Sequence, residues 1–120
     1  MRGLTLFVAT GDAERLHAAL SLAAVTAATG AKVRLHLHEG AVALLREPLV
    51  APNDALRGGA GLPTLAELWG EALALGVAVS LCQSGLAMSG LRLDELDPRL
   101  DAQGPAGLLS ELGDDLFAVF

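Results

Sequence analysis

The chain has 120 residues, of which 52% are hydrophobic and only four are aromatic, three Phe and one Trp. This length suits one domain, and a core made of Leu, Val and Ala favours helices packed on a sheet. A formal net charge of −6 argues against nucleic acid or an acidic membrane surface as a partner, because both require clustered Lys and Arg. The single cysteine cannot form an internal disulfide.

The chain carries no apolar run of about 18 residues, which is the length that crosses a bilayer. Its N-terminal apolar stretch is too short for a signal sequence, and Asp12 follows it at once. We therefore expect a cytoplasmic protein with one domain over residues 1–120 and no membrane contact.

The N-terminal third predicts a strand, a helix and a second strand. Residues 4–9, LTLFVA, are apolar on both faces, as in a central strand. Asp12 suits the N-cap of a helix over 13–29, whose apolar positions recur at spacings of three and four, and Gly30 ends it. Residues 32–38, KVRLHLH, alternate strictly, which predicts a strand with one polar face at the edge of the sheet.

The middle of the chain is less regular. A short apolar helix is predicted after Gly40. Residues 47–62 contain two prolines and a Gly-rich run, which predicts an irregular excursion with one turn of helix at 53–57. A helix with capping-box spacing at its start is predicted over 64–76.

The last part of the chain predicts two more strands. Residues 77–81 form an apolar strand, and a short helix over 84–88 follows it. Residues 92–105 are polar and turn-rich, and a helix over 106–112 then precedes a final strand over 116–120. Strands that alternate with helices predict an α/β fold: a three-layer α/β/α domain with a mostly parallel sheet of four to five strands.

The only cysteine, Cys82, lies where a strand hands over to a helix. In parallel sheets ligands bind at the carboxyl ends of the strands. If the first and third strands are neighbours, the loops 10–12 and 82–84 meet there. Free amides at a helix start stabilise a thiolate, so Cys82 is the candidate catalytic residue. The candidate binding residues are Thr10, Gly11, Asp12, Gln83 and Ser84. An unpaired cysteine can equally be a buried packing residue.

The histidines offer a weaker candidate site. His36 and His38 lie two apart on one strand face, a spacing that can chelate a metal, but no third ligand is evident. We favour a solvated or oligomer-facing pair over a metal site, and interpret His17 as a residue at the edge of the core. Neither a dinucleotide fingerprint nor a P-loop occurs, and we expect no cofactor.

Three stretches carry a resemblance to a known family: the start LTLFVATGDAERLHAALSLAAVTAATG, the run LGVAVSLCQSGLAMSG and the ending AGLLSELGDDLFAVF. Together they resemble the DsrE/DsrF-like family. The resemblance implies an α/β/α fold assembled as homotrimers or hexamers. It also implies sulfur-relay chemistry, in which a cysteine at the position of Cys82 holds a persulfide and passes it on. Such proteins serve sulfur oxidation or tRNA thiolation.

The predicted function is a sulfurtransferase-like sulfur relay, in which Cys82 carries a persulfide between a donor protein and an acceptor protein. The alternative is a non-catalytic oligomeric module that binds a small ligand or a protein, with a structural cysteine. A peroxide-reactive thiol is less favoured because the chain contains no resolving thiol. The apolar excess predicts a homo-oligomer that uses the 47–62 excursion and an outer helix as interfaces.

Overall fold

Residues 2–120 of the computed structural model form a five-stranded, all-parallel sheet in the order β4-β3-β2-β1-β5. The strands are β1 (Leu4–Val8), β2 (Val33–Leu37), β3 (Ala78–Leu81), β4 (Asp101–Ala102) and β5 (Leu116–Val119). The α-helices are α1 (Ala13–Ala28), α2 (Asp54–Gly59), α3 (Leu65–Ala74), α4 (Gln83–Ser89) and α5 (Pro105–Ser110), and two 3-10 helices are η1 (Glu39–Leu45) and η2 (Leu93–Glu95). The predicted α/β class is confirmed.

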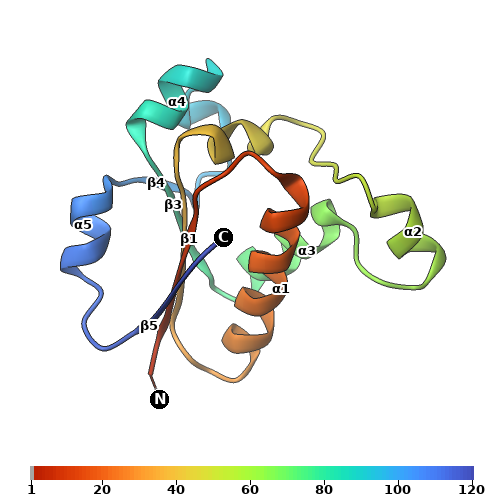
Figure 1. The fold of residues 1–120 in the computed structure, drawn as a ribbon, viewed down its shortest axis with the longest axis horizontal. Coiled ribbons are helices and arrows are strands. Elements are labelled where there is room, and N and C mark those ends of the chain that lie inside the picture. The colour runs from red at the N-terminus through yellow and green to blue at the C-terminus, as the bar shows by residue number, and fades with distance from the viewer. Residues whose placement is uncertain (1) are drawn as a thin grey trace.

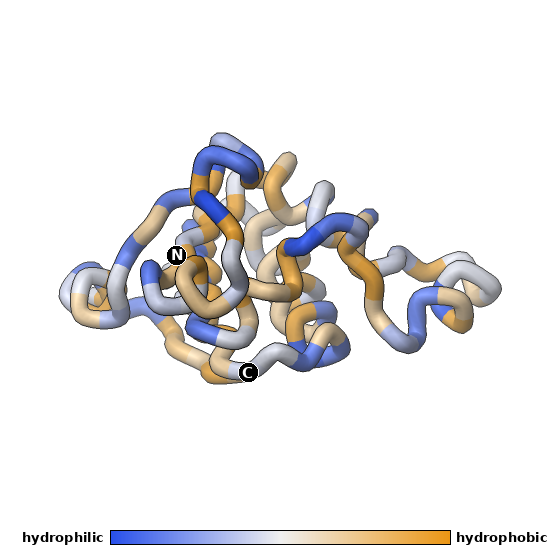
Figure 2. Tube along the Cα trace, turned by 90° about the horizontal axis from the view of Figure 1, so that it is seen from above, coloured by the Kyte–Doolittle hydropathy of each residue, from blue (hydrophilic) through white to orange (hydrophobic). Residues whose placement is uncertain are grey.

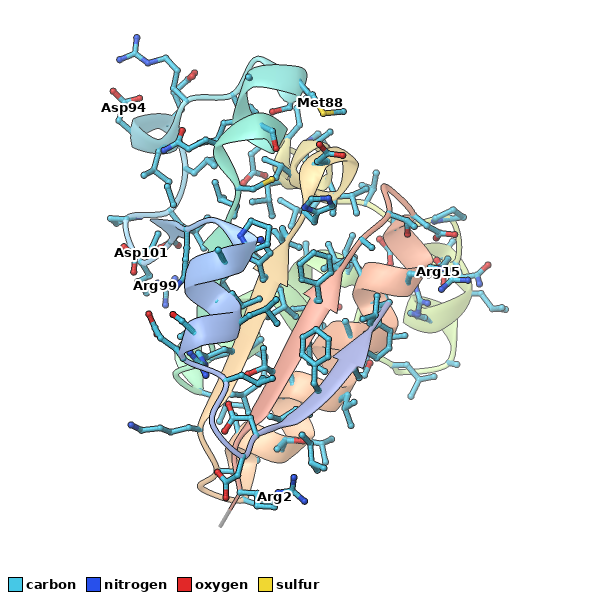
Figure 3. All side chains as sticks on the ribbon, turned by 60° about the vertical axis from the view of Figure 1, so that its left-hand side comes forward. Arg2, Arg15, Met88, Asp94, Arg99 and Asp101 are labelled. Carbon is cyan, nitrogen blue, oxygen red and sulfur yellow. The ribbon has the colours of Figure 1, made fainter. Side chains whose placement is uncertain are left out.

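The helices cover the two faces of the sheet unequally. Helices α1 and α3 pack side by side against one face (Figure 1). Successive side chains of a strand point to opposite faces of the sheet, and Leu6 and Leu35 lie on the face that these two helices cover, where they are fully buried. On the opposite face only the short helix α5 lies across the strands (Figure 3), and it buries Leu108. The three-layer prediction is confirmed, with a thin third layer.

Strand β2 lies in the middle of the sheet, so the prediction that it forms an edge is wrong. It pairs with β1 on one side and β3 on the other, with Leu35 in register with both Leu6 and Val79. Its polar face is covered: His36 is fully buried, and Arg34 forms ion pairs beneath α5. A central strand with polar groups paired on one face therefore shows the same alternation as an edge strand.

Strand β4 was not expected, because its two residues lie within the stretch 92–105 that we interpreted as a polar loop. It pairs with β3 through Ser80 and Asp101 and forms one edge of the sheet. The other edge is β5, which pairs only with β1. Two residues are too few for a periodic signal.

The excursion over 47–62 leaves the body of the molecule and carries α2, which matches the predicted helical turn (Figure 2). It is attached to α1 through Glu14, whose carboxylate pairs with Arg57 and accepts a bond of 3.0 Å from the backbone N–H of Asn53. Leu49 and Ala51 are buried, but Val50, Leu56 and Leu62 are exposed, and Leu56 is 75% exposed. No helix within residues 2–120 is long and apolar enough to cross a membrane.

Candidate functional site

Cys82 lies at the carboxyl end of β3 and is the N-cap residue of α4. Its backbone is extended, with φ −86° and ψ 151°, as N-cap residues usually are. Its N–H donates to the carbonyl of Leu37 at 3.2 Å, which extends the β2–β3 pairing by one step. The residue is 3% exposed and therefore buried. Helix α4, which it caps, lies at the upper end of the sheet in Figure 1.

Three hydrogen-bond donors converge on the Cys82 sulfur. The backbone N–H of Glu39 lies 3.0 Å from Sγ, and the backbone N–H of Gly85 and the hydroxyl of Ser84 each lie 3.3 Å from it. Burial raises the pKa of the Cys82 thiol, but the bonds from Ser84, Glu39 and Gly85 outweigh burial, and the pKa lies below its ordinary value. Donors arranged in this way favour the thiolate, which is the reactive form of cysteine.

Glycines allow the segments around the sulfur to approach so closely. A Cβ atom on Gly85 would lie 2.8 Å from the carbonyl oxygen of Glu39 and 2.9 Å from Cβ of Val42, so only glycine lets α4 rest against η1. Gly11 has the same role on the other side, where a Cβ atom would lie 3.0 Å from the carbonyl oxygen of Gly40. The start of η1 is thus held between the loop after β1 and the start of α4.

This arrangement changes where the predicted binding residues lie. The first and third strands are not neighbours, because β2 separates them. From β1 the chain adds β2, β3 and β4 on one side, and it then places β5 on the other side of β1, so the strand order switches direction between β1 and β5. Gln83 and Ser84 begin α4 next to the sulfur. Thr10, Gly11 and Asp12 lie beyond the start of η1, and Asp12 caps α1 as predicted, accepting a bond of 2.8 Å from the N–H of Glu14.

Glu39 is the residue near the sulfur that the sequence analysis did not identify. It follows β2, begins η1 and has a φ of +42°. If the strand continued, Glu39 would point to the face opposite His36 and His38, but β2 ends at Leu37. The dipeptide Glu39-Gly40 does not predict this backbone conformation, because the glutamate and not the glycine adopts the left-handed region.

A model of the DsrE/DsrF-like family matches residues 4–111. The chain belongs to the DsrE/DsrF-like family. Among solved structures, the ychN protein of Escherichia coli is similar over 100% of both chains, with a TM-score of 0.68 and 21% sequence identity, which supports the shared fold. A search of curated proteins found no match. The family predicted from the sequence is confirmed.

Replacing Ser84 with alanine in this DsrE/DsrF-like chain is expected to make Cys82 less acidic. The hydroxyl of Ser84 lies 3.3 Å from Sγ and stabilises the thiolate, so its loss should lower the ionisation constant about fivefold, the equivalent of ~1 kcal/mol. Ultraviolet absorbance of the thiolate against pH measures this. The matched control is Ser89→Ala on the same helix, whose hydroxyl donates instead to the carbonyl of Leu86. Equal titrations of the two variants would contradict the assignment.

Of the two alternatives for His36 and His38, the solvated pair is wrong because His36 is buried, while the oligomer-facing pair stays a prediction. His36 is fully buried, and its Nδ1 lies 2.8 Å from the hydroxyl of Ser80. Its Nε2 has no hydrogen-bond partner within residues 2–120, and the ring of Phe7 contacts both histidines. The part of the chain that the structure describes contains no group of three side chains suited to a metal.

Burial, followed by the nearby His38, lowers the pKa of His36 below its ordinary value of 6.5. The unfolded chain therefore takes up a proton below about pH 6.5 that the folded chain refuses, so this contribution to stability is present above that pH and is lost as the pH falls. We expect the free energy of unfolding, measured with urea from pH 7.5 to 5, to fall more steeply for the natural protein than for His36→Gln. Parallel pH profiles would contradict this.

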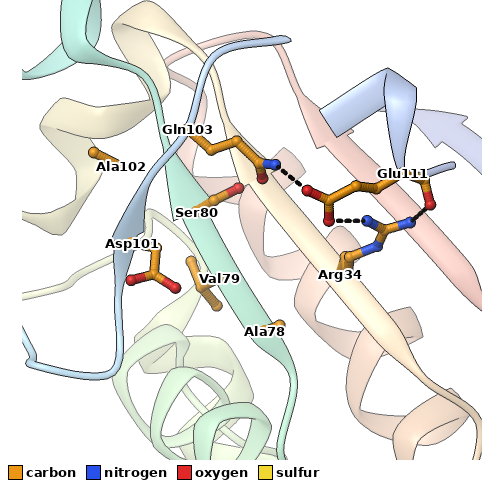
Figure 4. Close-up of a pocket in the computed structure, with 8 residues that line it drawn as sticks. All are labelled: Arg34, Ala78, Val79, Ser80, Asp101, Ala102, Gln103 and Glu111. Atoms are coloured by element: carbon orange, nitrogen blue, oxygen red, sulfur yellow. Dashed lines mark hydrogen bonds and ion pairs between the residues drawn. The ribbon is translucent and has the colours of Figure 1, made fainter. Parts of the chain in front are cut away.

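A separate cavity of about 340 Å³ opens between β3, β4 and α5 (Figure 4). The carboxylate of Glu111 crosses it, accepting bonds of 3.1 Å from Nη1 of Arg34 and from Nε2 of Gln103. Ser80 and Asp101 also line it. The donors of Arg34 and Gln103 are both taken up by Glu111, so the cavity resembles a small-ligand pocket in size, but these two donors are already paired.

Proposed function

We propose that this protein is a sulfurtransferase-like sulfur relay in which Cys82 carries a persulfide. The observation that carries the proposal is the convergence of three uncharged donors on the only thiol of the chain. Membership of the DsrE/DsrF-like family supports the same chemistry. Gln83 and Ser84 are proposed to contact the incoming sulfur group, whereas Thr10, Gly11 and Asp12 are proposed to bind the approaching partner.

The proposed reaction needs no external oxidant. The thiolate of Cys82 attacks the outer sulfur of a donor persulfide, so that a new S–S bond forms at Cys82 while the donor's S–S bond breaks. The electron pair of that bond leaves with the donor cysteine, which departs as a thiolate and takes a proton from water. In the second step an acceptor thiolate attacks the outer sulfur, and Cys82 leaves as a thiolate. Amide donors stabilise Cys82 as nucleophile and as leaving group.

The proposal includes a homo-oligomer, trimeric or hexameric, that works in the cytoplasm with separate donor and acceptor proteins. Exposed apolar side chains on the excursion support an interface there: Val50, Leu56 and Leu62. Outer helix α1 also exposes Val25. Sedimentation equilibrium of the natural protein is the matching measurement, and a strict monomer would remove this part of the proposal.

Mass spectrometry of the intact protein after exposure to inorganic polysulfide tests the relay. We expect the natural protein to gain the mass of one sulfur atom, to lose it on addition of a thiol acceptor, and Cys82→Ser to gain nothing. Ser89→Ala is the control that should load normally. A natural protein that keeps its unmodified mass would contradict the proposal, as would equal loading of Cys82→Ser.

A second candidate function is a non-catalytic oligomeric module, and one observation favours it: Cys82 is 3% exposed in the single chain. A structural thiol would resist iodoacetamide in the native protein and react only after unfolding. A relay thiol would react in the native protein, faster as the pH rises. The rate at which iodoacetamide alkylates the native protein therefore distinguishes the relay from the non-catalytic module.

A further inference from the structure

We infer that Glu39 is a positioning residue for Cys82, and that it acts through its left-handed backbone and not through its carboxylate. The inference rests on the proposed function, because it concerns how the same sulfur is kept reactive. Glu39 donates its backbone N–H to Sγ at 3.0 Å, the shortest of the three contacts to the sulfur.

The conformation of Glu39 is unusual. Among residues 2–120 it is the one non-glycine residue with a positive φ, at +42°. A residue with a Cβ atom adopts this region at a cost, and such residues persist only where the surroundings hold them. The other five residues with positive φ are glycines that end helices or turns. Within the part of the chain that the structure describes, the one non-glycine residue in this strained region therefore also contacts the candidate nucleophile.

Both peptide planes that flank Glu39 are fixed by neighbours. The carbonyl of His38, in the plane that also carries the Glu39 N–H, accepts a bond of 2.9 Å from the N–H of Ala41. On the other side, the carbonyl oxygen of Glu39 rests against Gly85, where a Cβ atom would approach to 2.8 Å. A return of Glu39 to negative φ requires one of these planes to rotate, and rotation of the first plane turns its N–H away from the sulfur.

The side chain of Glu39 does not serve the sulfur. It is 48% exposed, and its Oε1 lies 3.6 Å from Nε2 of His38. These two side chains are the titratable groups of the segment packed against Cys82, whereas α4 presents only uncharged Gln83, Ser84 and Gly85. A carboxylate near a thiolate would oppose ionisation, while the N–H favours it. The two effects of one residue are therefore opposite in sign and can be separated by substitution.

During sulfur transfer the position of this N–H matters twice. It stabilises the charge on Sγ when Cys82 attacks, and again when Cys82 departs as the leaving group, since both steps place charge on the same atom. While the persulfide is held, the negative charge lies on the outer sulfur, so this N–H stabilises it less. Glu39 thus assists the two states in which Sγ itself is charged.

Three substitutions at position 39 test the inference. Valine keeps the N–H but disfavours positive φ, because β-branched residues adopt it only as outliers. Glycine accepts positive φ freely. Glutamine removes the charge and leaves the backbone as it is. The readout is the thiolate absorbance of each variant against pH, with Cys82→Ser as blank, and it requires no sulfur loading.

We expect Glu39→Val to lower the ionisation constant of Cys82 about tenfold, as the loss of one bond to a charged group implies. Glu39→Gly should ionise at least as readily as the natural protein and melt at a higher temperature, because the strain is relieved. Glu39→Gln should ionise no less readily than the natural protein.

A Glu39→Val titration equal to that of the natural protein would overturn the inference. A weaker thiol acid in both Glu39→Gly and Glu39→Gln would also overturn it, since the carboxylate would then be responsible. Failure of the natural protein to load sulfur, with these titrations as expected, would refute the relay and leave the positioning role standing. If Glu39→Val does not fold, the melting temperature of Glu39→Gly decides, and a lower value than the natural protein's overturns the inference.

Discussion

Gly85→Ala is expected to lower the melting temperature by roughly 10 °C and to weaken the acidity of Cys82 together with it. The added Cβ atom would lie 2.8 Å from the Glu39 carbonyl oxygen and 2.9 Å from Cβ of Val42. The backbone of η1 cannot yield as the end of a flexible side chain can, so α4 must move away from η1. Overpacking of this kind costs about 2–3 kcal/mol in a domain of this size. The separation also draws the amides of Glu39 and Gly85 from the sulfur.

Gly70→Ala is the matched control for that prediction. Gly70 lies within α3, and a Cβ atom there would meet nothing within 4 Å. Alanine favours a helix more than glycine does, so this variant should be more stable by about 0.5–1 kcal/mol. Thermal unfolding followed by circular dichroism measures both variants. The same substitution should thus have opposite signs at the two sites, and stabilisation by Gly85→Ala would refute the close packing of α4 on η1.

Leu35→Ala is expected to have the largest effect on stability alone. Leu35 is fully buried in β2, the middle strand, beneath α1 and α3. Its truncation removes apolar contacts and leaves a cavity that neighbouring strands on both sides prevent from closing. We expect a loss of about 2–5 kcal/mol in the free energy of unfolding, measured with urea.

The comparison with Leu116→Ala makes that measurement a test of the strand order. Leu116 lies on the edge strand β5 and is 53% exposed, so its truncation should cost less than about 1 kcal/mol. An edge position for β2 would bring the two losses close together. Equal effects of the two variants would therefore contradict the central position of β2.

The sequence predicted the individual helices and strands of this fold better than the order of the strands in the sheet. The apolar run at 4–9, the capped helix after Asp12 and the capping box at Thr64 each have a local cause, and each is present in the structure. The strand order has no local cause. The alternation in 32–38 indicates one polar face, but it cannot reveal that Ser80 of β3 and Glu111 at the end of α5, both from distant parts of the chain, pair with His36 and Arg34 on that face.

The sequence predicted the candidate nucleophile, Cys82, but not the residues that surround it. A cysteine between an apolar strand and a helix start is visible in the sequence, and so is Ser84 two residues later. The third donor comes from Glu39, which is 43 residues away and depends on a left-handed backbone that no pattern signals. The sequence does not indicate that Gly85 must be glycine either, because that requirement arises from the packing of α4 against η1.

The acidity of Cys82 tests the central claim most directly. The chain contains one cysteine and no tyrosine, so the difference in ultraviolet absorbance between the natural protein and Cys82→Ser reports a single thiolate without tyrosinate overlap. We predict a titration midpoint below about 8.5, the reference value for a free cysteine, because three donors stabilise the charged sulfur. A midpoint at or above that value would mean that burial prevails and that Cys82 is a packing residue.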